Sequence, residues 1–314
     1  MGLKKELRRQ WSGLGKRRED DWDYWEVWES WDNLDREKNI INMMPSFTDS
    51  SMRFGMTSKP KKSLGQNFLI NQGIVQKIIA AAELKNSDNV LEVGPGKGVL
   101  TFELAERVKR LVAVEKDDLL CDGIVEMVGK LGKVGIFNED ILKFDLNELK
   151  KEFQGEPYKV VANLPYNITS KFLRIFLEAD YHPTEMILMV QKEVAERICA
   201  KPGQMSVLAV SVQFFCEPKI LFKVSPGSFF PAPKVESAVI KLANISGDRF
   251  KVNQEKFFEI VKAGFSARRK QLKNNLKQIF GDNTELAIKS AGLKPEQRPQ
   301  ELEVGDWVKL VRLL

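Results

Sequence analysis

A glycine-rich turn between two apolar segments constrains this chain more than any other feature. Val90, Leu91 and Val93 predict a short buried strand, which ends at the turn 94–98, Gly-Pro-Gly-Lys-Gly. Apolar residues then recur at helical spacing over 99–108. A strand, a glycine turn and a helix form the first unit of a nucleotide-binding α/β sheet, because glycine lets a ligand lie directly on the backbone.

A second apolar strand, 111–114, ends in Glu115. An acidic side chain at the carboxyl end of the second strand can accept both hydroxyls of a ribose. The glycine spacing is Gly-x-Gly-x-Gly, and dinucleotide folds have Gly-x-Gly-x-x-Gly. These features suit an adenosine-containing ligand and leave NAD and S-adenosylmethionine both open.

Two later strands are also followed by polar side chains. The strand predicted at 133–137 precedes Asp140, whose carboxylate could accept a hydrogen bond from the amine of an adenine held over the sheet. The strand predicted at 158–162 ends in the tetrapeptide 163–166, Asn-Leu-Pro-Tyr. Proline fixes φ and has no N–H, so the carbonyl before it is free to face a substrate. With the asparagine oxygen as a second acceptor and the tyrosine ring as a stacking face, this tetrapeptide suits a flipped base that bears an NH2 group.

Length and composition predict one large domain and a smaller one. The chain has 314 residues, of which 43% are hydrophobic and 29% are charged. No apolar run approaches the ~20 residues that span a bilayer, and the amino terminus lacks the apolar core of a signal peptide. Three widely spaced cysteines predict reduced thiols and no metal site. We therefore expect a cytoplasmic protein with no membrane contact, and a monomer.

The positive charge is concentrated near the carboxyl terminus. The formal net charge is +6, and residues 251–314 hold 13 basic and 8 acidic side chains. A basic helix is predicted over 262–277, a segment with no acidic residue, and nucleic acid is the leading candidate for its partner. The residues expected to contact RNA are Arg268, Arg269, Lys270 and Lys273, with Lys61 and Lys62 in a basic lead-in to the folded part.

The remaining segments complete the expected domain plan. Residues 1–58 hold five of the six tryptophans among dense charges and predict an extension that is disordered or loosely docked, with no assigned function. Residues 59–245 are the predicted catalytic domain and 246–314 a helical RNA-binding domain. Within the former, the apolar run 206–216 is expected to be a central strand of the sheet, and the proline-rich loop 226–237 to present Phe229 and Phe230.

Five motifs, in this order, resemble the KsgA (RsmA) family of small-subunit ribosomal RNA adenine dimethyltransferases. They are Leu64-Gly-Gln-Asn-Phe-Leu, Val90-Leu-Glu-Val-Gly-Pro-Gly-Lys-Gly, Asn163-Leu-Pro-Tyr-Asn-Ile, Pro231-Ala-Pro-Lys-Val-Glu-Ser-Ala-Val and Arg298-Pro-Gln-Glu-Leu. The resemblance covers residues 59–314. It implies an α/β fold of the class I (Rossmann-like) S-adenosylmethionine-dependent methyltransferases, with a seven-stranded sheet and a small C-terminal helical domain.

The resemblance also implies roles for single residues. Asn67 and Leu69 would close over the cofactor S-adenosyl-L-methionine, and Gly94, with Gly96 in the same turn, would lie under its methionine end. Glu115 would bind the ribose hydroxyls, Asp140 the adenine amine, and Asn163 both cofactor and target. Lys97 departs from the family pattern, which more often has an apolar or small residue there.

The implied reaction methylates N6 of adjacent adenosines in a small-subunit (16S) ribosomal RNA loop during ribosome biogenesis. We expect the Asn163 amide oxygen and the Leu164 carbonyl, freed by Pro165, to accept the N6 hydrogens, and the rings of Tyr166 and Phe229 to sandwich the base. Three alternatives stay open: an Erm-type methyltransferase of large-subunit RNA, a non-catalytic ribosome-assembly factor, and an NAD oxidoreductase.

Overall fold

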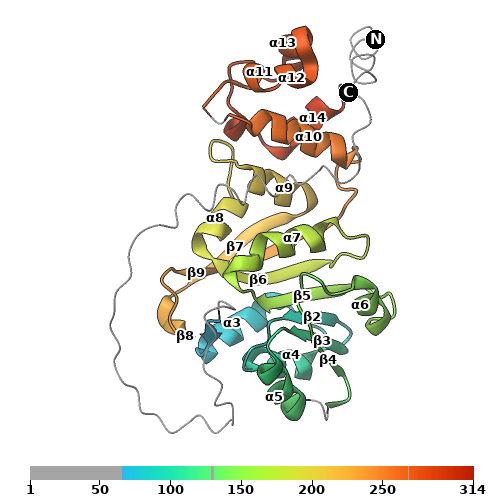
Figure 1. The fold of residues 1–314 in the computed structure, drawn as a ribbon, viewed down its shortest axis with the longest axis vertical. Helices are drawn as coiled ribbons and strands as arrows, with labels where there is room; N and C mark the ends of the chain where they lie inside the picture. Colours follow the sequence, from blue (N-terminus) through green and yellow to red (C-terminus); the bar gives the residue numbers. More distant parts are fainter. Residues whose placement is uncertain (1–65, 129–130, 268) are drawn as a thin grey trace. The chain divides into compact units, whose positions relative to one another are not determined.

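The computed structural model describes residues 66–128, 131–267 and 269–314 (Figure 1). These residues form two compact units. One unit holds the sheet, and comprises the described residues up to Lys192 together with Lys219–Ala243. The other is helical, and comprises Glu193–Pro218 and Asn244–Leu314. The segment 193–218 therefore belongs with the carboxyl-terminal helices, although it lies within the predicted catalytic domain 59–245.

The sheet has seven strands in the order β4-β3-β2-β5-β6-β9-β7, which confirms the predicted fold class. The strands β2 to β6 are mutually parallel, and β9 runs antiparallel to β6. The chain begins this sheet at β2, moves outward to β4 and then returns to β5 beside β2. Ligands of open α/β sheets bind at the carboxyl ends of the strands where the order reverses in this way. The strands are β2 Asn89–Val93, β3 Arg110–Glu115, β4 Val134–Asn138, β5 Tyr158–Asn163, β6 Glu185–Gln191, β7 Glu217–Val224 and β9 Ser237–Ala243.

Helices connect the parallel strands. Among the described residues of this unit, α3 Gln72–Ala82 precedes β2, and the connecting helices are α4 Val99–Arg107, α5 Asp118–Val128, α6 Leu146–Glu152 and α7 Thr169–Glu178. Helix α3 begins where the Asn71 side chain accepts a hydrogen bond from the Ile74 N–H, and α4 begins directly after Gly98. The position of the glycine turn is therefore tied to the packing of α4.

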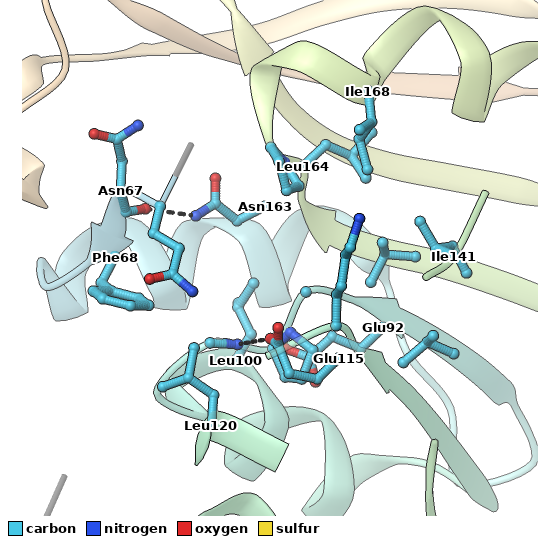
Figure 2. A pocket seen from close by; sticks show the side chains of 18 of the residues that line it. Asn67, Phe68, Glu92, Leu100, Glu115, Leu120, Ile141, Asn163, Leu164 and Ile168 are labelled. Atoms are coloured by element: carbon cyan, nitrogen blue, oxygen red, sulfur yellow. Dashed lines mark hydrogen bonds between the residues drawn. The ribbon is translucent and has the colours of Figure 1, made fainter. Parts of the chain in front are cut away.

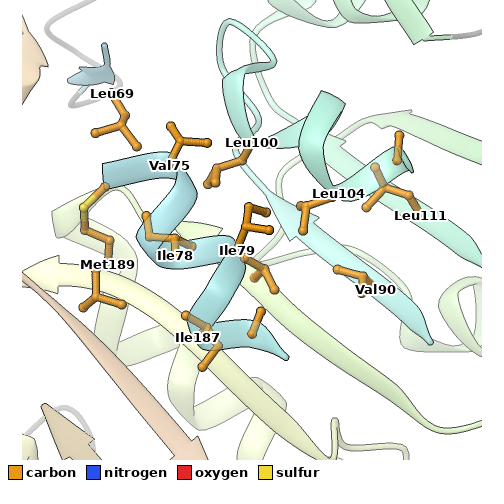
Figure 3. Close-up of a cluster of buried hydrophobic side chains, with 14 of the residues drawn as sticks. Leu69, Val75, Ile78, Ile79, Val90, Leu100, Leu104, Leu111, Ile187 and Met189 are labelled. Atoms are coloured by element: carbon orange, nitrogen blue, oxygen red, sulfur yellow. The ribbon is translucent and has the colours of Figure 1, made fainter. Parts of the chain in front are cut away.

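An apolar cluster holds α3 and α4 against one face of the sheet (Figure 3). Val75 and Ile78 from α3 and Leu104 from α4 pack with Val90 of β2 and Ile187 of β6, and each of these side chains is at most 1% exposed. Complete burial of an aliphatic side chain contributes ~1.5–3 kcal/mol. This cluster therefore fixes the edge of the sheet from which the glycine turn projects.

A second, two-stranded sheet joins the start of the described chain to the loop before β9. Strand β1, Phe68–Leu69, pairs antiparallel with β8, Phe229–Phe230. The pairing continues where the Ile70 N–H donates to the Ser228 carbonyl at 2.9 Å. The segment Gln66–Ile70, which we call the strap, is thereby held to the body of this unit.

The helical unit contains α8 Lys192–Ile198 except for its first residue, and all of α9 Val207–Phe215, α10 Gln254–Phe265, α11 Leu272–Asn275, α12 Lys277–Phe280, α13 Thr284–Ser290 and α14 Val304–Val311. Aromatic rings fill its core. The rings of Phe214 and Phe257 lie 4.1 Å apart, centroid to centroid. Gly264 of α10 leaves room for Trp307 of α14, because a Cβ at this glycine would lie 2.3 Å from the indole ring.

The prediction of a central strand over 206–216 is wrong, because this segment forms α9. The Ser206 side chain caps the helix by accepting a hydrogen bond from the Ala209 N–H. Seven of the nine helix residues are buried, so no polar face reveals the helical period in the sequence. The strand lies just downstream, in β7.

The prediction of one basic helix over 262–277 is also wrong. Helix α10 ends at Phe265 and α11 begins at Leu272. The Asn275 side chain donates to the carbonyls of Gly264 and Ala267, which turns the chain back upon the end of α10. A buried amide that forms hydrogen bonds with the end of the preceding helix is a tertiary interaction. The spacing of apolar residues in the sequence does not predict it.

Candidate active site

Residues at the ends of four parallel strands line one cavity (Figure 2). Gly94 follows β2, Glu115 ends β3, Asp140 comes after β4, and Asn163 ends β5. Parallel strands bring their carboxyl ends to the same edge of a sheet, so these residues meet although they are far apart in the sequence. The structure thus brings together the predicted cofactor-binding residues of the sheet. Asn67, Leu69 and Gly96 line the same cavity.

The glycine turn has a backbone that other residues rarely adopt. Gly94, Gly96 and Gly98 have φ values of +62°, +59° and +76°, in the left-handed region. A Cβ on Gly96 would lie 3.1 Å from the Phe68 ring. Glycine is therefore required here both by the backbone angle and by the strap that lies upon it.

Glu115 is held by two backbone N–H groups. Gly96 donates to Oε2 at 3.0 Å and Asp117 donates to Oε1 at 2.9 Å. Burial raises the pKa of Glu115, the backbone hydrogen bonds oppose this shift, and the charge of Asp117 adds to it. Each carboxyl oxygen keeps a further lone pair, so this side chain can still accept hydroxyl groups from a ligand.

Asp140 is engaged on both oxygens. Lys116 Nζ lies 2.8 Å from Oδ2, and the Leu142 N–H donates to Oδ1 at 3.1 Å. Partial burial alone would raise the pKa of Asp140, but the hydrogen bonds from Lys116 and Leu142 outweigh it and the pKa lies below its usual value. Asp140 is therefore an anion at neutral pH and can accept a hydrogen bond from an amine.

Asn163 is oriented by the strap. Its Nδ2 donates to the Asn67 carbonyl oxygen at 3.3 Å. Because the nitrogen is used in this way, the oxygen is the amide atom presented for a further contact, and Figure 2 shows it directed away from Asn67. The contact joins the first described segment of the chain to the end of β5.

The rest of the tetrapeptide continues the cavity wall. Leu164, Pro165 and Tyr166 all line it. The Tyr166 hydroxyl lies 2.7 Å from Ser237 Oγ, which anchors the ring. Burial raises the pKa of Tyr166, partly opposed by the bond to Ser237, so the phenol is neutral at physiological pH.

Phe229 is not where the sequence prediction placed it. Its side chain is 3% exposed, belongs to the apolar cluster of the sheet, and is absent from the cavity lining. Phe230, the next residue of β8, is 57% exposed. Successive side chains of a strand point to opposite faces, so the pairing of β8 with β1 turns one ring inward and the other outward.

Glu92 was missed by the sequence analysis. It lies within β2, is 1% exposed, and lines the cavity with an Oε2 atom that has no hydrogen-bond partner. Burial raises the pKa of Glu92 to about 8, with the Thr101 side chain opposing the shift and the charge of Glu115 adding to it. The signal available in the sequence was an acidic residue inside the otherwise apolar run 90–93.

The expected RNA-binding residues are only partly described. Arg269 and Lys270 are exposed between α10 and α11. Lys273 pairs with Glu285 at 3.2 Å, so part of its charge is already neutralised within the helical unit. Arg268, Lys61 and Lys62 lie outside the described residues, as does the extension 1–58.

Within the described residues, no group of three or more His, Cys, Asp or Glu residues could hold a metal ion. No helix in the same ranges is both long and apolar enough to cross a bilayer.

Comparison with known proteins identifies relatives over most of the chain. Residues 57–314 match the family model for ribosomal RNA adenine dimethylase. A "Ribosomal RNA small subunit methyltransferase A" from Dehalococcoides mccartyi is 44% identical over 263 residues, which cover 82% of this chain and 90% of that protein. A protein of the same name from Clostridium botulinum is 41% identical over 257 residues, covering 80% of this chain and 93% of the relative.

Solved structures give the same fold. A dimethyladenosine transferase from Plasmodium falciparum superposes with a TM-score of 0.65 at 26% identity, over 77% of this chain and 95% of the other. The 23S rRNA methyltransferase ErmE superposes with a TM-score of 0.64 at 27% identity, over 79% of this chain and 99% of the other.

Proposed function

Because the chain belongs to the ribosomal RNA adenine dimethylase family, we propose that it methylates N6 of adjacent adenosines in a loop of small-subunit (16S) ribosomal RNA. The product is N6,N6-dimethyladenosine, formed during ribosome biogenesis in the cytoplasm. The observation that carries this proposal is the single cavity that unites Glu115, Asp140 and Asn163 at three strand ends. One nucleoside-sized ligand can contact all three only if they share such a cavity.

The residues present fit S-adenosyl-L-methionine as the methyl donor. The glycine turn leaves bare backbone under a ligand, Glu115 suits the ribose hydroxyls, and Asp140 is an ionised acceptor for the adenine amine. Asn67 and Leu69 belong to the strap and would close over the cofactor. When bound, this cofactor supplies a methyl group already activated by its sulfonium.

The protein's own task is then to align the target amine. The N6 lone pair of adenine is delocalised into the ring, so the nitrogen is a poor nucleophile. The Asn163 oxygen and the Leu164 carbonyl would accept the two N6 hydrogens, which favours a pyramidal nitrogen and stabilises its developing positive charge. Tyr166, anchored by Ser237, would stack on the flipped base. A strong base is not needed, because the methylated ammonium readily loses its proton.

Phe229 can join this stack only if its ring leaves the apolar cluster, since it is buried in the present structure. Among the described residues of the turn between α10 and α11, Arg269 and Lys270 are exposed cations that would contact phosphates. The protein would act as a monomer on the immature small subunit.

The resemblance to ErmE supports a second candidate, methylation of large-subunit RNA. To decide, immature small subunits and large-subunit RNA would each be incubated with the protein and labelled S-adenosylmethionine. Mass spectrometry of the nucleosides would then locate the label. We expect dimethyladenosine at neighbouring positions of the small-subunit RNA alone. Label in large-subunit RNA would favour the second candidate, and no transfer to either would favour a non-catalytic assembly factor.

A further inference from the structure

Lys97 is a half-buried cation in the wall of the active-site cavity. The other lysine of this wall, Lys116, forms an ion pair with Asp140 at 2.8 Å. In the described part of the chain, no carboxylate pairs with Lys97. A charge that is partly withdrawn from water and lacks an opposite partner is poised to bind an anionic group of a ligand.

The strap holds this cation in place. Lys97 Nζ lies 5.3 Å from the centre of the Phe68 ring, within the range of a cation–π contact. The Phe68 ring is 7% exposed, and its edge lies against Gly96. The ring is further fixed by the pairing of Phe68 with Phe230 in the two-stranded sheet. Lys97 therefore points along the strap side of the cavity.

The strap side is remote from the side expected to bind adenine. In Figure 2, Asn67, Phe68 and Asn163 lie on one side of the cavity, whereas Ile141, the neighbour of Asp140, lies on the other. If Asp140 and Glu115 hold the adenosine of the cofactor, as the proposed function states, its amino-acid end lies toward the strap. That end carries an ammonium group and a carboxylate.

The charges around the cavity distinguish these two groups. The Lys97 ammonium attracts the carboxylate and repels the ammonium of this end. We propose that Lys97 binds the carboxylate of the cofactor's methionine end, and thereby selects cofactors that retain this carboxylate. The inference rests on the proposed function, because it requires that the cavity bind this cofactor.

The proposal predicts opposite effects on ligands of opposite local charge. S-adenosylmethionine and S-adenosylhomocysteine both have the carboxylate. Decarboxylated S-adenosylmethionine has only positive groups at this end and is repelled by Lys97. Methylthioadenosine has neither group. Removal of the lysine charge should therefore weaken the binding of S-adenosylmethionine and S-adenosylhomocysteine and strengthen that of decarboxylated S-adenosylmethionine. The binding of methylthioadenosine should stay unchanged.

The test is titration calorimetry of the full chain with these four ligands. Lys97→Met removes the charge and keeps an apolar stem against Phe68, and Lys97→Arg is the matched control that keeps a cation. We expect Lys97→Met to weaken S-adenosylmethionine and S-adenosylhomocysteine about tenfold, as for a lost hydrogen bond to a charged group. The decarboxylated ligand should bind as well or more tightly, methylthioadenosine equally, and Lys97→Arg should bind all four nearly as the wild type does.

Two outcomes would overturn the proposal. Equal weakening of all four ligands would show that Lys97 acts only by holding Phe68. Unchanged binding of S-adenosylmethionine and S-adenosylhomocysteine would exclude the carboxylate contact, even if RNA binding fell. A wild-type protein that bound none of the ligands would instead refute the proposed function.

Discussion

Two glycines, one in each unit, both face an aromatic ring and serve different ends. Gly96 has φ +59° and lies against Phe68 at the cavity, where the strap needs bare backbone. Gly264 lies inside helix α10 and makes room for the fully buried Trp307. The comparison shows that one residue type makes room for the strap at the cavity and allows dense packing in the helical unit. Changes in the first region should alter binding and turnover, and changes in the second should alter stability.

Asn163→Ala should give the largest effect, which is a loss of turnover with little change in stability. Loss of one preorganised acceptor for the target amine should lower kcat about 10²–10³-fold, as for other transition-state hydrogen bonds. Asn163 is at the surface of the cavity and bonds only the Asn67 carbonyl, so the free energy of unfolding should change little. Single-turnover kinetics and urea denaturation measure the two quantities. Near-normal turnover would remove Asn163 from its proposed role.

Gly264→Ala should show the reverse pattern. The new methyl group would overlap the Trp307 ring, and overpacking of this kind costs up to about 3 kcal/mol in the free energy of unfolding. Gly305→Ala, in the same helix as Trp307, is the matched control: its Cβ would be 3.4 Å from the flexible Glu303 side chain. That variant should be neutral or more stable by about 0.5–1 kcal/mol. Equal stabilities of the two variants in urea would contradict this account of the core.

Glu92→Gln should make stability at the sheet edge less dependent on pH. The native pKa of Glu92 is about 8 and the ordinary value is 4.5, so the folded protein holds a proton that the unfolded chain releases between these values. Wild-type stability should therefore decrease as pH rises from 4.5 to 8. The variant should match the wild type near pH 4 and exceed it, on the order of 5 kcal/mol, at pH 9. Parallel stability profiles from pH 4 to 9 would show that Glu92 ionises normally.

Gly96→Ala should have a modest effect on stability and a clear effect on cofactor affinity. A left-handed backbone costs a non-glycine residue ~1–2 kcal/mol, and the methyl group would press on Phe68. Because the Phe68 ring can shift with the strap, unfolding should change by about that amount while cofactor affinity falls further. Calorimetry with S-adenosylhomocysteine checks this, with Gly227→Ala, whose Cβ meets no atom within 4 Å, as the control. Unchanged affinity would mean that the turn does not contact the cofactor.

The sequence predicted the sheet edge well because its signals are local. The change from apolar residues to glycine, glutamate or asparagine marks the end of a strand in the sequence. Gly94, Glu115 and Asn163 were therefore placed correctly at strand ends. Asp140 followed from the same reasoning. Their meeting in one cavity depends only on parallel strand order, which the alternation of strands and helices implies.

The features that sequence reasoning missed depend on tertiary contacts. Helix α9 is buried nearly all round, so its apolar run could not be distinguished from a central strand. The break after Phe265 depends on the Asn275 side chain, ten positions away. Which of Phe229 and Phe230 faces inward depends on how β8 pairs with β1. The lack of a hydrogen-bond partner at the Glu92 Oε2 atom also became visible only in three dimensions.

The pairing of β1 with β8 has a consequence for biosynthesis. Phe68 and Leu69 leave the ribosome early, whereas Phe229 and Phe230 are translated only after β2 to β7. Until then the strap lacks the strand that holds it, although the Asn67 carbonyl and the Asn163 amide have both been made. A nascent chain would thus complete this wall of the cavity only after Phe230 has been made, which under the proposed function makes binding of the methyl donor wait for that part of the chain.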